Sequence, residues 1–273
     1  ADMLEGYTTI GDDAFYNCSS LKSVTIPNSV TSIGGAAFHG CSSLTSVIIP
    51  NSVTYIGDVA FYDCSSLTSI EMPNSVTYIG RYAFYDCTRL ASPVYNAHVF
   101  AFMPTSYSGA YTIPDGIESI AGGAFYNCSY LTSITIPNSV TNIGIAVFYN
   151  CTSLTSVTIP NSVTSIELGA FKDCTDLASV TIGDKTYENQ TVTNGKCKAY
   201  KGFKSDMTCR DFQYKEGETY EYEGEPKLCK SGFHASLNLS DVFNYYYGKF
   251  GKDIVIHEVE LEGVSDECNE FDS

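Results

Sequence analysis

Apolar and polar positions alternate along the chain in short runs that return at a fixed distance. In residues 41–57, CSSLTSVIIPNSVTYIG, the apolar residues Leu44, Val47 and Ile49 are interleaved with serine and threonine. This β-branched pattern predicts a short strand. Pro50 ends that strand because it has no N–H to donate, and the PNS sequence that it opens predicts a turn.

A second extended piece follows the turn. In VTYIG, residues 53–57, Val53 and Ile56 are expected to face inward. The next segment, DVAFYDC at 58–64, predicts a single helical or 3₁₀ turn that places Phe61 and Cys64 in the core. One unit is thus expected to contain two short strands and one turn of helix.

The unit repeats with a period of 23 residues. A phenylalanine marks it at positions 15, 38, 61 and 84, and again at 125, 148 and 171, with a cysteine three residues later each time. Such a period is the signature of a solenoid, whose coils bury their apolar faces by stacking on one another. Cys87 and Cys128 are 41 residues apart, which is 23 + 18. Either one coil carries an 18-residue insertion, or a shortened coil lies between two regular ones.

The consensus L-x-S-V-x-I-P-x-S-V-T-x-I-G-x-x-A-F-x-x-C recurs at least six times between about residues 5 and 182. It resembles the BspA-like leucine-rich repeat, the 23-residue class found on bacterial and protozoan surface proteins. The resemblance implies an α/β solenoid of about eight coils. It also implies a secreted or cell-surface module that acts in recognition or adhesion, without catalysis, by binding a protein or a glycan.

The period stops near Gly183, which divides the chain. Residues 1–182 are predicted to form the solenoid, 183–195 a polar linker, and 196–273 a small α+β domain. In that domain we expect strands at 197–203, 219–224 and 253–263, and a helix at 239–250 with Ser240 as its N-cap.

Composition narrows the classes of partner that the chain is expected to bind. The formal net charge is −16. Lysine and arginine number 4 against 13 aspartate and glutamate in residues 1–182, and 11 against 18 in 183–273. Without a basic stripe, the chain is predicted not to bind nucleic acid, and anionic membrane surfaces are poor partners. No apolar run is long enough to predict membrane insertion. The start, ADMLEGYTTIG, begins partway through a coil with no signal segment, so we expect a mature or trimmed N-terminus.

The eleven cysteines fall into two groups. The seven repeat cysteines are expected to be buried and unpaired, because stacked identical rotamers do not give the dihedral angle that a disulfide needs. Four lie outside the repeats, and they allow two disulfides in three connectivities. Zinc with His234 is the alternative, but the spacing C-x₁₁-C-x₁₉-C-x₄-H matches no compact site, so no metal is predicted. These four are Cys197, Cys209, Cys229 and Cys268.

The interruption at about residues 93–111 is predicted to form a β-hairpin and is rich in aromatic residues. It has two interpretations. It can be a variant coil with its rings in the core, which aromatic strand residues favour. It can also be an exposed patch that anchors a partner. The binding candidates are Tyr95, His98, Phe100 and Tyr107, expected to be partly exposed beside the strand face.

The outward positions of the first strand carry serine and threonine with almost no charge. Threonine is common on solvated sheets because of its β-propensity, and this accounts for the pattern without a ligand. A flat hydroxyl-rich surface can also serve as a recognition face for a protein or a glycan. The candidates on this face are Thr45, Thr68, Thr132 and Thr155.

The C-terminal part has a second resemblance. The order YKGF, SGFHAS, SDVFNYY, VIHEVELEG resembles ADP-ribosyltransferase-like domains, and a similar run resembles an uncharacterised domain of bacterial and phage proteins. The former implies NAD as cofactor, although Lys201 stands where that family has arginine or histidine. His234 can equally be a packing histidine. The implied nicotinamide contacts are Tyr200 and Gly202, the ribose-side residues Gly232, His234 and Ser236, the stacking residue Tyr245 or Tyr246, and the acid Glu258 or Glu260.

Overall fold

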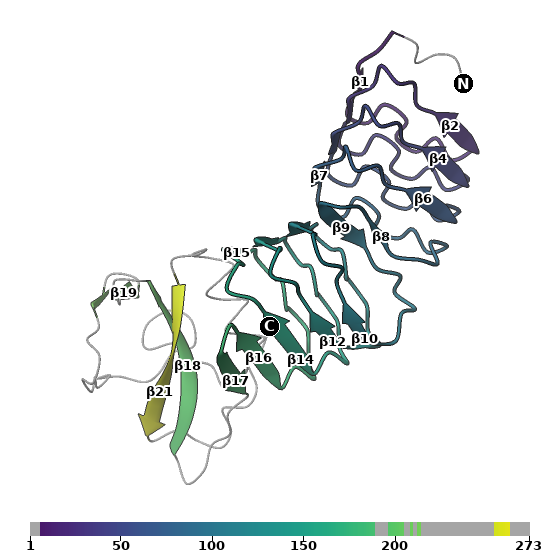
Figure 1. The fold of residues 1–273 in the computed structure, drawn as a ribbon. Helices are drawn as coiled ribbons and strands as arrows, with labels where there is room; N and C mark the ends of the chain where they lie inside the picture. The colour runs from purple at the N-terminus through teal and green to yellow at the C-terminus, as the bar shows by residue number, and fades with distance from the viewer. Residues whose placement is uncertain (1–5, 189–195, 205–207, 210–211, 214–253, 263–273) are drawn as a thin grey trace.

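The structure is a computed structural model. It describes residues 6–188, 196–204, 208–209, 212–213 and 254–262. Within these residues the chain forms a solenoid of parallel β-coils followed by short antiparallel pairs (Figure 1).

Each regular coil contributes one strand to each of two sheets. In the N-terminal half, one sheet runs in the order β1-β3-β5-β7 and the other in the order β2-β4-β6. All neighbours are parallel, and partners such as Ile33 and Ile56 are one repeat apart. The strands are β1 (Thr9–Ile10), β2 (Ser23–Thr25), β3 (Ser32–Ile33), β4 (Ser46–Ile48), β5 (Tyr55–Ile56), β6 (Ser69–Glu71) and β7 (Tyr78–Ile79).

The C-terminal half repeats this arrangement. Its sheets have the orders β10-β12-β14-β16-β17 and β15-β13-β11-β9-β8. The strands are β8 (Val94–Tyr95), β9 (Val99–Phe102), β10 (Gly109–Thr112), β11 (Ser119–Ile120), β12 (Leu131–Thr135), β13 (Asn142–Ile143), β14 (Ser156–Ile159), β15 (Ser165–Ile166), β16 (Ser179–Ile182) and β17 (Lys185–Glu188). Figure 1 shows the two halves as two stacks that meet at an angle near β8 and β9.

The third segment of each coil is not helical, so the expected helical turn is wrong. In residues 58–64, Val59 and Asp63 have φ values of 50° and 53° in the left-handed region, which no α-helix contains. The N–H groups of Val59, Phe61 and Asp63 donate to carbonyls of the next coil at 2.8–2.9 Å. They are therefore unavailable for i→i−4 bonds. The described residues contain no helix, and the α/β class is not confirmed.

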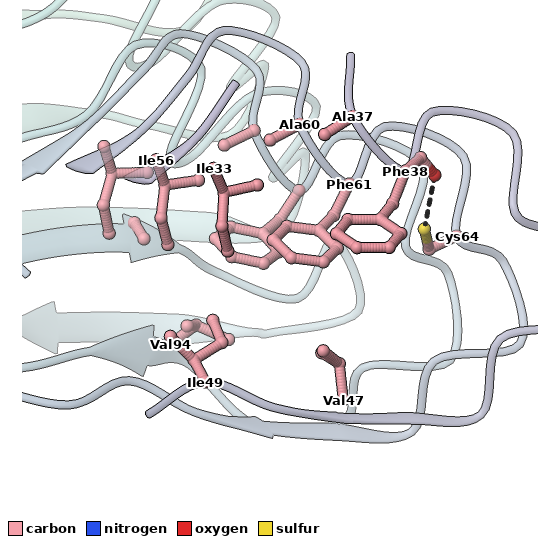
Figure 2. Packing of buried hydrophobic residues seen from close by; sticks show 14 of the residues in the cluster. Ile33, Ala37, Phe38, Val47, Ile49, Ile56, Ala60, Phe61, Cys64 and Val94 are labelled. Atoms are coloured by element: carbon pink, nitrogen blue, oxygen red, sulfur yellow. Dashed lines mark hydrogen bonds between the residues drawn. The ribbon is translucent and has the colours of Figure 1, made fainter. Parts of the chain in front are cut away.

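The core is a set of ladders along the solenoid axis. Phe15, Phe38, Phe61 and Phe84 stack with ring centroids 5.1–5.4 Å apart and planes within 8° of parallel. Figure 2 shows Phe38 and Phe61 in this column, beside the paired isoleucines Ile33 and Ile56. The buried residues divide into two clusters that meet at the interruption. The interruption is therefore also the boundary between two cores.

The first part of the predicted linker contains a strand. Residues 185–188 form β17, which pairs antiparallel with β16, and the Tyr187 side chain is buried against the second core cluster. The last parallel strand would otherwise present unpaired N–H and C=O groups, and an antiparallel return satisfies them within a few residues. The prediction of a linker over 183–195 is therefore wrong for these four residues.

Beyond the solenoid, β18 (Lys196–Lys204) pairs antiparallel with β21 (Ile254–Glu262), and β19 (Thr208–Cys209) with β20 (Phe212–Gln213). The strands predicted at 197–203 and 253–263 are confirmed. The strand expected at 219–224 and the helix expected at 239–250 lie outside the described residues. The part of the chain that the structure describes holds no helix long and apolar enough to cross a membrane.

Candidate binding site at the shortened coil

The 41-residue gap contains a shortened coil. β8 and β9 form the predicted hairpin, and β9 then pairs in parallel with β11 as an ordinary coil would. Asn96 lies 23 residues after Pro73, whereas Pro114 follows Asn96 after only 18. The missing five residues belong to the turn segment, because no A-F-x-x-C sequence follows β9.

Asn96 anchors this coil to the one before it. Its Nδ2 donates to the carbonyls of Pro73 at 2.8 Å and Val76 at 2.7 Å. Its Oδ1 accepts from the N–H groups of His98 at 2.9 Å and Val99 at 2.8 Å. Asn96 is buried, so a side chain that uses both donors and its acceptor offsets the cost of its own desolvation.

Two residues replace the missing turn segment. The Phe100 ring stacks on Phe125 at 4.8 Å and 8°, and so fills the aromatic column that a repeat phenylalanine would fill. The Met103 N–H donates to Ala124 O at 2.7 Å, as Phe38 N–H does to Ala60 O. The chain thereby keeps the ladder without the five residues. The prediction that Phe100 is partly exposed is wrong, since it is completely buried.

The missing segment leaves an opening on the turn edge, between the coils of residues 80–90 and 121–131. A cavity of about 490 Å³ lies there, a size typical of small-ligand sites. Its walls come from three coils and combine aromatic, hydroxyl, amide and carboxylate groups. They are Tyr85, Asp86, Cys87, Thr88, Leu90, Phe102, Pro104, Thr105, Ser106, Gly123, Tyr126, Asn127, Ser129 and Tyr130.

The other predicted aromatic residues surround Phe100. Tyr95 stacks on Phe100 at 5.7 Å and is 42% exposed. Tyr107 is half-buried, and its hydroxyl donates to Ala110 O at 2.7 Å. Tyr111 joins the cluster edge-to-face with both Tyr107 and Phe100, and burial raises its pKa to about 12. Of these rings, Tyr95 offers the most surface to a partner.

His98 is half-buried, and its Nδ1 lies 3.3 Å from Glu118 Oε1. Both side chains are substantially open to solvent, at 37% and 66%, so a charged pair here would contribute little. His98 is therefore partly open to solvent and is not fixed by a strong interaction.

The threonine strip has a structural role that the sequence did not reveal. Thr45, Thr68 and Thr155 are exposed, and each hydroxyl donates to the carbonyl one repeat earlier, at 3.1, 3.3 and 3.0 Å. Thr132 is also exposed, and its carbonyl accepts the bond from Thr155. These hydroxyls join neighbouring coils, which leaves mainly acceptor lone pairs and methyl groups for a ligand.

The seven repeat cysteines are free thiols, as predicted. Six are buried, but Cys18, in the first coil, is exposed, so the prediction of burial is wrong there. Five of the buried thiols donate to the carbonyl of the preceding coil's phenylalanine, as Cys64 Sγ does to Phe38 O at 3.2 Å (Figure 2). The sixth, Cys128, lies after the shortened coil and donates to Met103 O at 3.7 Å. Desolvation by burial raises the pKa of Cys64 to about 12, and that of Cys41 to about 11. These thiols are therefore inert.

A second aromatic row, on the turn edge, was missed. It consists of the residue after each core phenylalanine, and neighbouring ring centroids are 4.6–5.1 Å apart. At its far end, Lys172 Nζ lies 5.7 Å from the Tyr149 ring. The recurrence of a tyrosine or histidine directly after the core phenylalanine was the sequence signal for this row. The row is Tyr16, His39, Tyr62, Tyr85, Tyr126 and Tyr149.

The alternative site is only partly described. In the β18–β21 pair, Tyr200 is in register with Glu258, Gly202 with Ile256, and Lys198 with Glu260. Gly232, His234, Ser236, Tyr245 and Tyr246 lie outside the described residues, as do Cys229 and Cys268. The described residues contain no group of metal-ligating side chains.

The coils, ladders and 23-residue register define a leucine-rich-repeat solenoid. Residues 8–105 and 98–204 match the BspA type leucine rich repeat region, in six copies, and the chain belongs to this family. Residues 197–273 match a domain of unknown function, DUF7666. A search of curated proteins found no match.

Several solved structures are similar. The T. pallidum leucine rich repeat protein is 30% identical over 60% of this chain and 70% of its own, with a TM-score of 0.40. A leucine rich cell surface protein from Faecalibacterium prausnitzii A2-165 is 28% identical over 64% and 76%, with a TM-score of 0.27. The pneumococcal vaccine antigen PcpA is 20% identical over 59% and 62%, with a TM-score of 0.35.

Proposed function

We propose that the chain is a non-enzymatic surface recognition or adhesion module that binds a protein or a glycan through the shortened coil and the adjoining strand face. Family membership supports a recognition role, and the observation that carries the site is Tyr95. It is 42% exposed and backed by the buried ring of Phe100. A rigid aromatic side chain on a packed support can contribute much affinity at small entropic cost.

The solenoid supports this role in a second way. Its strand face is nearly uncharged and fixed by inter-coil threonine bonds, so a ligand meets a preordered surface. Preorganisation lowers the entropic cost of binding. The module is proposed to act outside the cell, because the BspA-like repeat is a class found on surface proteins.

The test is binding of the purified chain to arrays of glycans and of purified extracellular proteins. The matched pair of variants is Tyr95→Ala and Tyr55→Ala, because both tyrosines are 42% exposed. Tyr95→Ala should weaken binding to a positive spot about tenfold or more, and Tyr55→Ala should not. Equal effects of the two substitutions, or none from Tyr95→Ala, would contradict the site.

A second candidate function lies in the C-terminal part, as an NAD-binding or ADP-ribosyltransferase-like domain. One observation favours it: the register that pairs Tyr200 with Glu258 brings two of the implied residues to one place in the sheet. Calorimetric titration of the full chain with NAD and nicotinamide tests it, with Tyr200→Ala, Glu258→Gln and Glu260→Gln. Heats that are absent, or unchanged in all three variants, would exclude this candidate.

A further inference from the structure

The cavity at the shortened coil lies on the turn edge, and Tyr95, His98 and Phe100 of the proposed recognition site do not line it. Tyr85 and Asp86 come from the coil before it, Thr105 and Ser106 from the shortened coil, and Tyr130 from the coil after it. The cavity exists because five turn residues are missing, so within the described residues no other coil can form the same opening. It is a unique place in a repetitive molecule.

The charge that lines the cavity is negative only. Of the described residues that line it, Asp86 is the one charged group, and none is a lysine or arginine. Asp86 forms no ion pair with any residue that the structure describes. Partial desolvation, and then the carboxylate of Asp63 in the preceding coil, raise the pKa of Asp86. An anionic ligand is therefore disfavoured, and a cation would relieve the local excess of negative charge.

The aromatic walls favour the same ligand. Tyr85 and Tyr126 meet edge-to-face at 4.9 Å and 86°, and Tyr126 stacks on Tyr149 at 4.6 Å and 2°. The ring face of Tyr126 toward Tyr149 is thus covered, which leaves little open face there for a sugar ring. Tyr130 is 62% exposed at the rim. Further along the same row the chain places its own ammonium group over a ring, with Lys172 Nζ 5.7 Å from Tyr149. Cation–π contact is therefore already used on this row.

We infer that the cavity binds an arginine or lysine side chain presented by a basic segment of a partner protein, with Asp86 as the counter-ion and Tyr85 and Tyr130 as aromatic walls. The hydroxyl oxygens of Thr105 and Ser106 can accept further hydrogen bonds from the head group. The net charge of −16 would speed the approach of such a segment at low salt. This inference does not depend on the site at Tyr95.

The test is a ligand-observed NMR titration of the full chain with a neutral-flanked pentapeptide that carries one arginine. The citrulline peptide of the same sequence and maltotriose serve as uncharged probes. The key variant is Asp86→Asn, which is structurally mild. Asp86 has a φ of 57°, and Asn17, Asn127 and Asn150 occupy the same repeat position with φ values of 55–61°. The matched control is Asp173→Asn, with the same repeat position, a φ of 60° and the same loss of charge, outside the cavity.

We expect the arginine peptide to bind, and Asp86→Asn and Tyr130→Ala each to weaken it about tenfold. Asp173→Asn should leave the affinity within about twofold, because Asp173 is exposed and does not line the cavity, so its charge is screened by solvent. The citrulline peptide should bind at least about tenfold more weakly than the arginine peptide. Because Tyr130 is an exposed side chain, its loss should not unfold the coil.

Three results would overturn the inference. Absence of arginine-peptide binding would do so directly. Equal weakening by Asp86→Asn and Asp173→Asn would mean general attraction to an acidic protein. Binding of maltotriose that depends on Tyr130 but not on Asp86 would assign the cavity to a neutral sugar. Failure here leaves the Tyr95 array result unaffected, and the reverse also holds, so the two proposals are separable.

Discussion

Replacement of Asn96 tests the structural basis of the shortened coil. Asn96→Ala removes four hydrogen bonds of 2.7–2.9 Å from a buried position. At about 1 kcal/mol net per bond the loss is about 4 kcal/mol, and water that enters the space left by the side chain would reduce it to about 2–4 kcal/mol. The control is Asn51→Ala, in an exposed turn, which should change stability by no more than about 0.5 kcal/mol.

Asn96→Asp gives a sharper outcome. The aspartate can still accept from the His98 and Val99 N–H groups, but its second oxygen would face the carbonyls of Pro73 and Val76. The charged form is disfavoured there, so the folded-state pKa of the new carboxyl rises above its unfolded value of about 3.9. The folded protein then binds more protons than the unfolded one, and stability falls as pH rises above about 4.

Urea unfolding followed by circular dichroism at pH 4 and pH 7 measures both effects. Relative to the unsubstituted chain, Asn96→Asp should lose more stability at pH 7 than at pH 4. Asn96→Ala should lose the same amount at both. If Asn96→Asp is as stable as the unsubstituted chain at pH 7, the amide does not donate to the two carbonyls and the reasoning fails.

Two further predictions concern the regular coils. A Cβ on Gly57 would lie 2.5 Å from Gly35 N, so Gly57→Ala should lower the free energy of unfolding by about 1–3 kcal/mol. A Cβ on Gly11, at the same repeat position, has nothing within 4 Å, so Gly11→Ala should lower it by less than about 0.5 kcal/mol. Thermal unfolding compares the two variants, and equal losses of stability would contradict the close approach of the backbones. Iodoacetamide at pH 8 with peptide mapping should modify Cys18 in the native chain at least about tenfold faster than Cys41, Cys64 or Cys87, since burial raises the pKa of those three, whereas all four should react alike in denaturant. Fast native labelling of Cys64 would contradict the thiol ladder.

The regular coils could be predicted from sequence because one residue type recurs at each buried position. Val53, Ile56, Phe61 and Cys64 were expected inside and are completely buried. The helical turn was mispredicted because DVAFYDC reads locally as helix-compatible, whereas the next coil's carbonyls take its N–H groups. Hydrogen bonds between neighbouring coils are non-local interactions, which the local propensity of a seven-residue segment does not predict.

The error at Phe100 has a specific cause. Alternation in a strand assigns successive side chains to a buried and an exposed face. All four residues of β9 are buried, because this strand lies where the two core clusters meet. Phe100 packs into the C-terminal cluster, while Val99, Ala101 and Phe102 pack into the N-terminal one. A strand covered on both sides gives no exposed set, and its residues then read as a continuous apolar run.

The anchoring role of Asn96 and the cavity both follow from the five-residue deletion, which the spacing of the repeats in the sequence already indicates. The residue 23 positions after Pro73 is asparagine where the regular coils have proline, and the next proline of this series comes 18 positions later. Loss of five residues from a stacked coil must either break the ladders or be compensated by side chains. Asn96 satisfies the backbone and Phe100 restores the aromatic column, so the core remains continuous. On the turn edge the flanking coils meet directly, with the Tyr82 N–H donating to Gly122 O at 2.7 Å and Tyr85 against Tyr126 at 4.9 Å. Open volume remains beside this contact, along Asp86, Thr105 and Tyr130. A regular solenoid offers every ligand many equivalent positions. A single deletion makes one position different, and that position is where selective binding can arise.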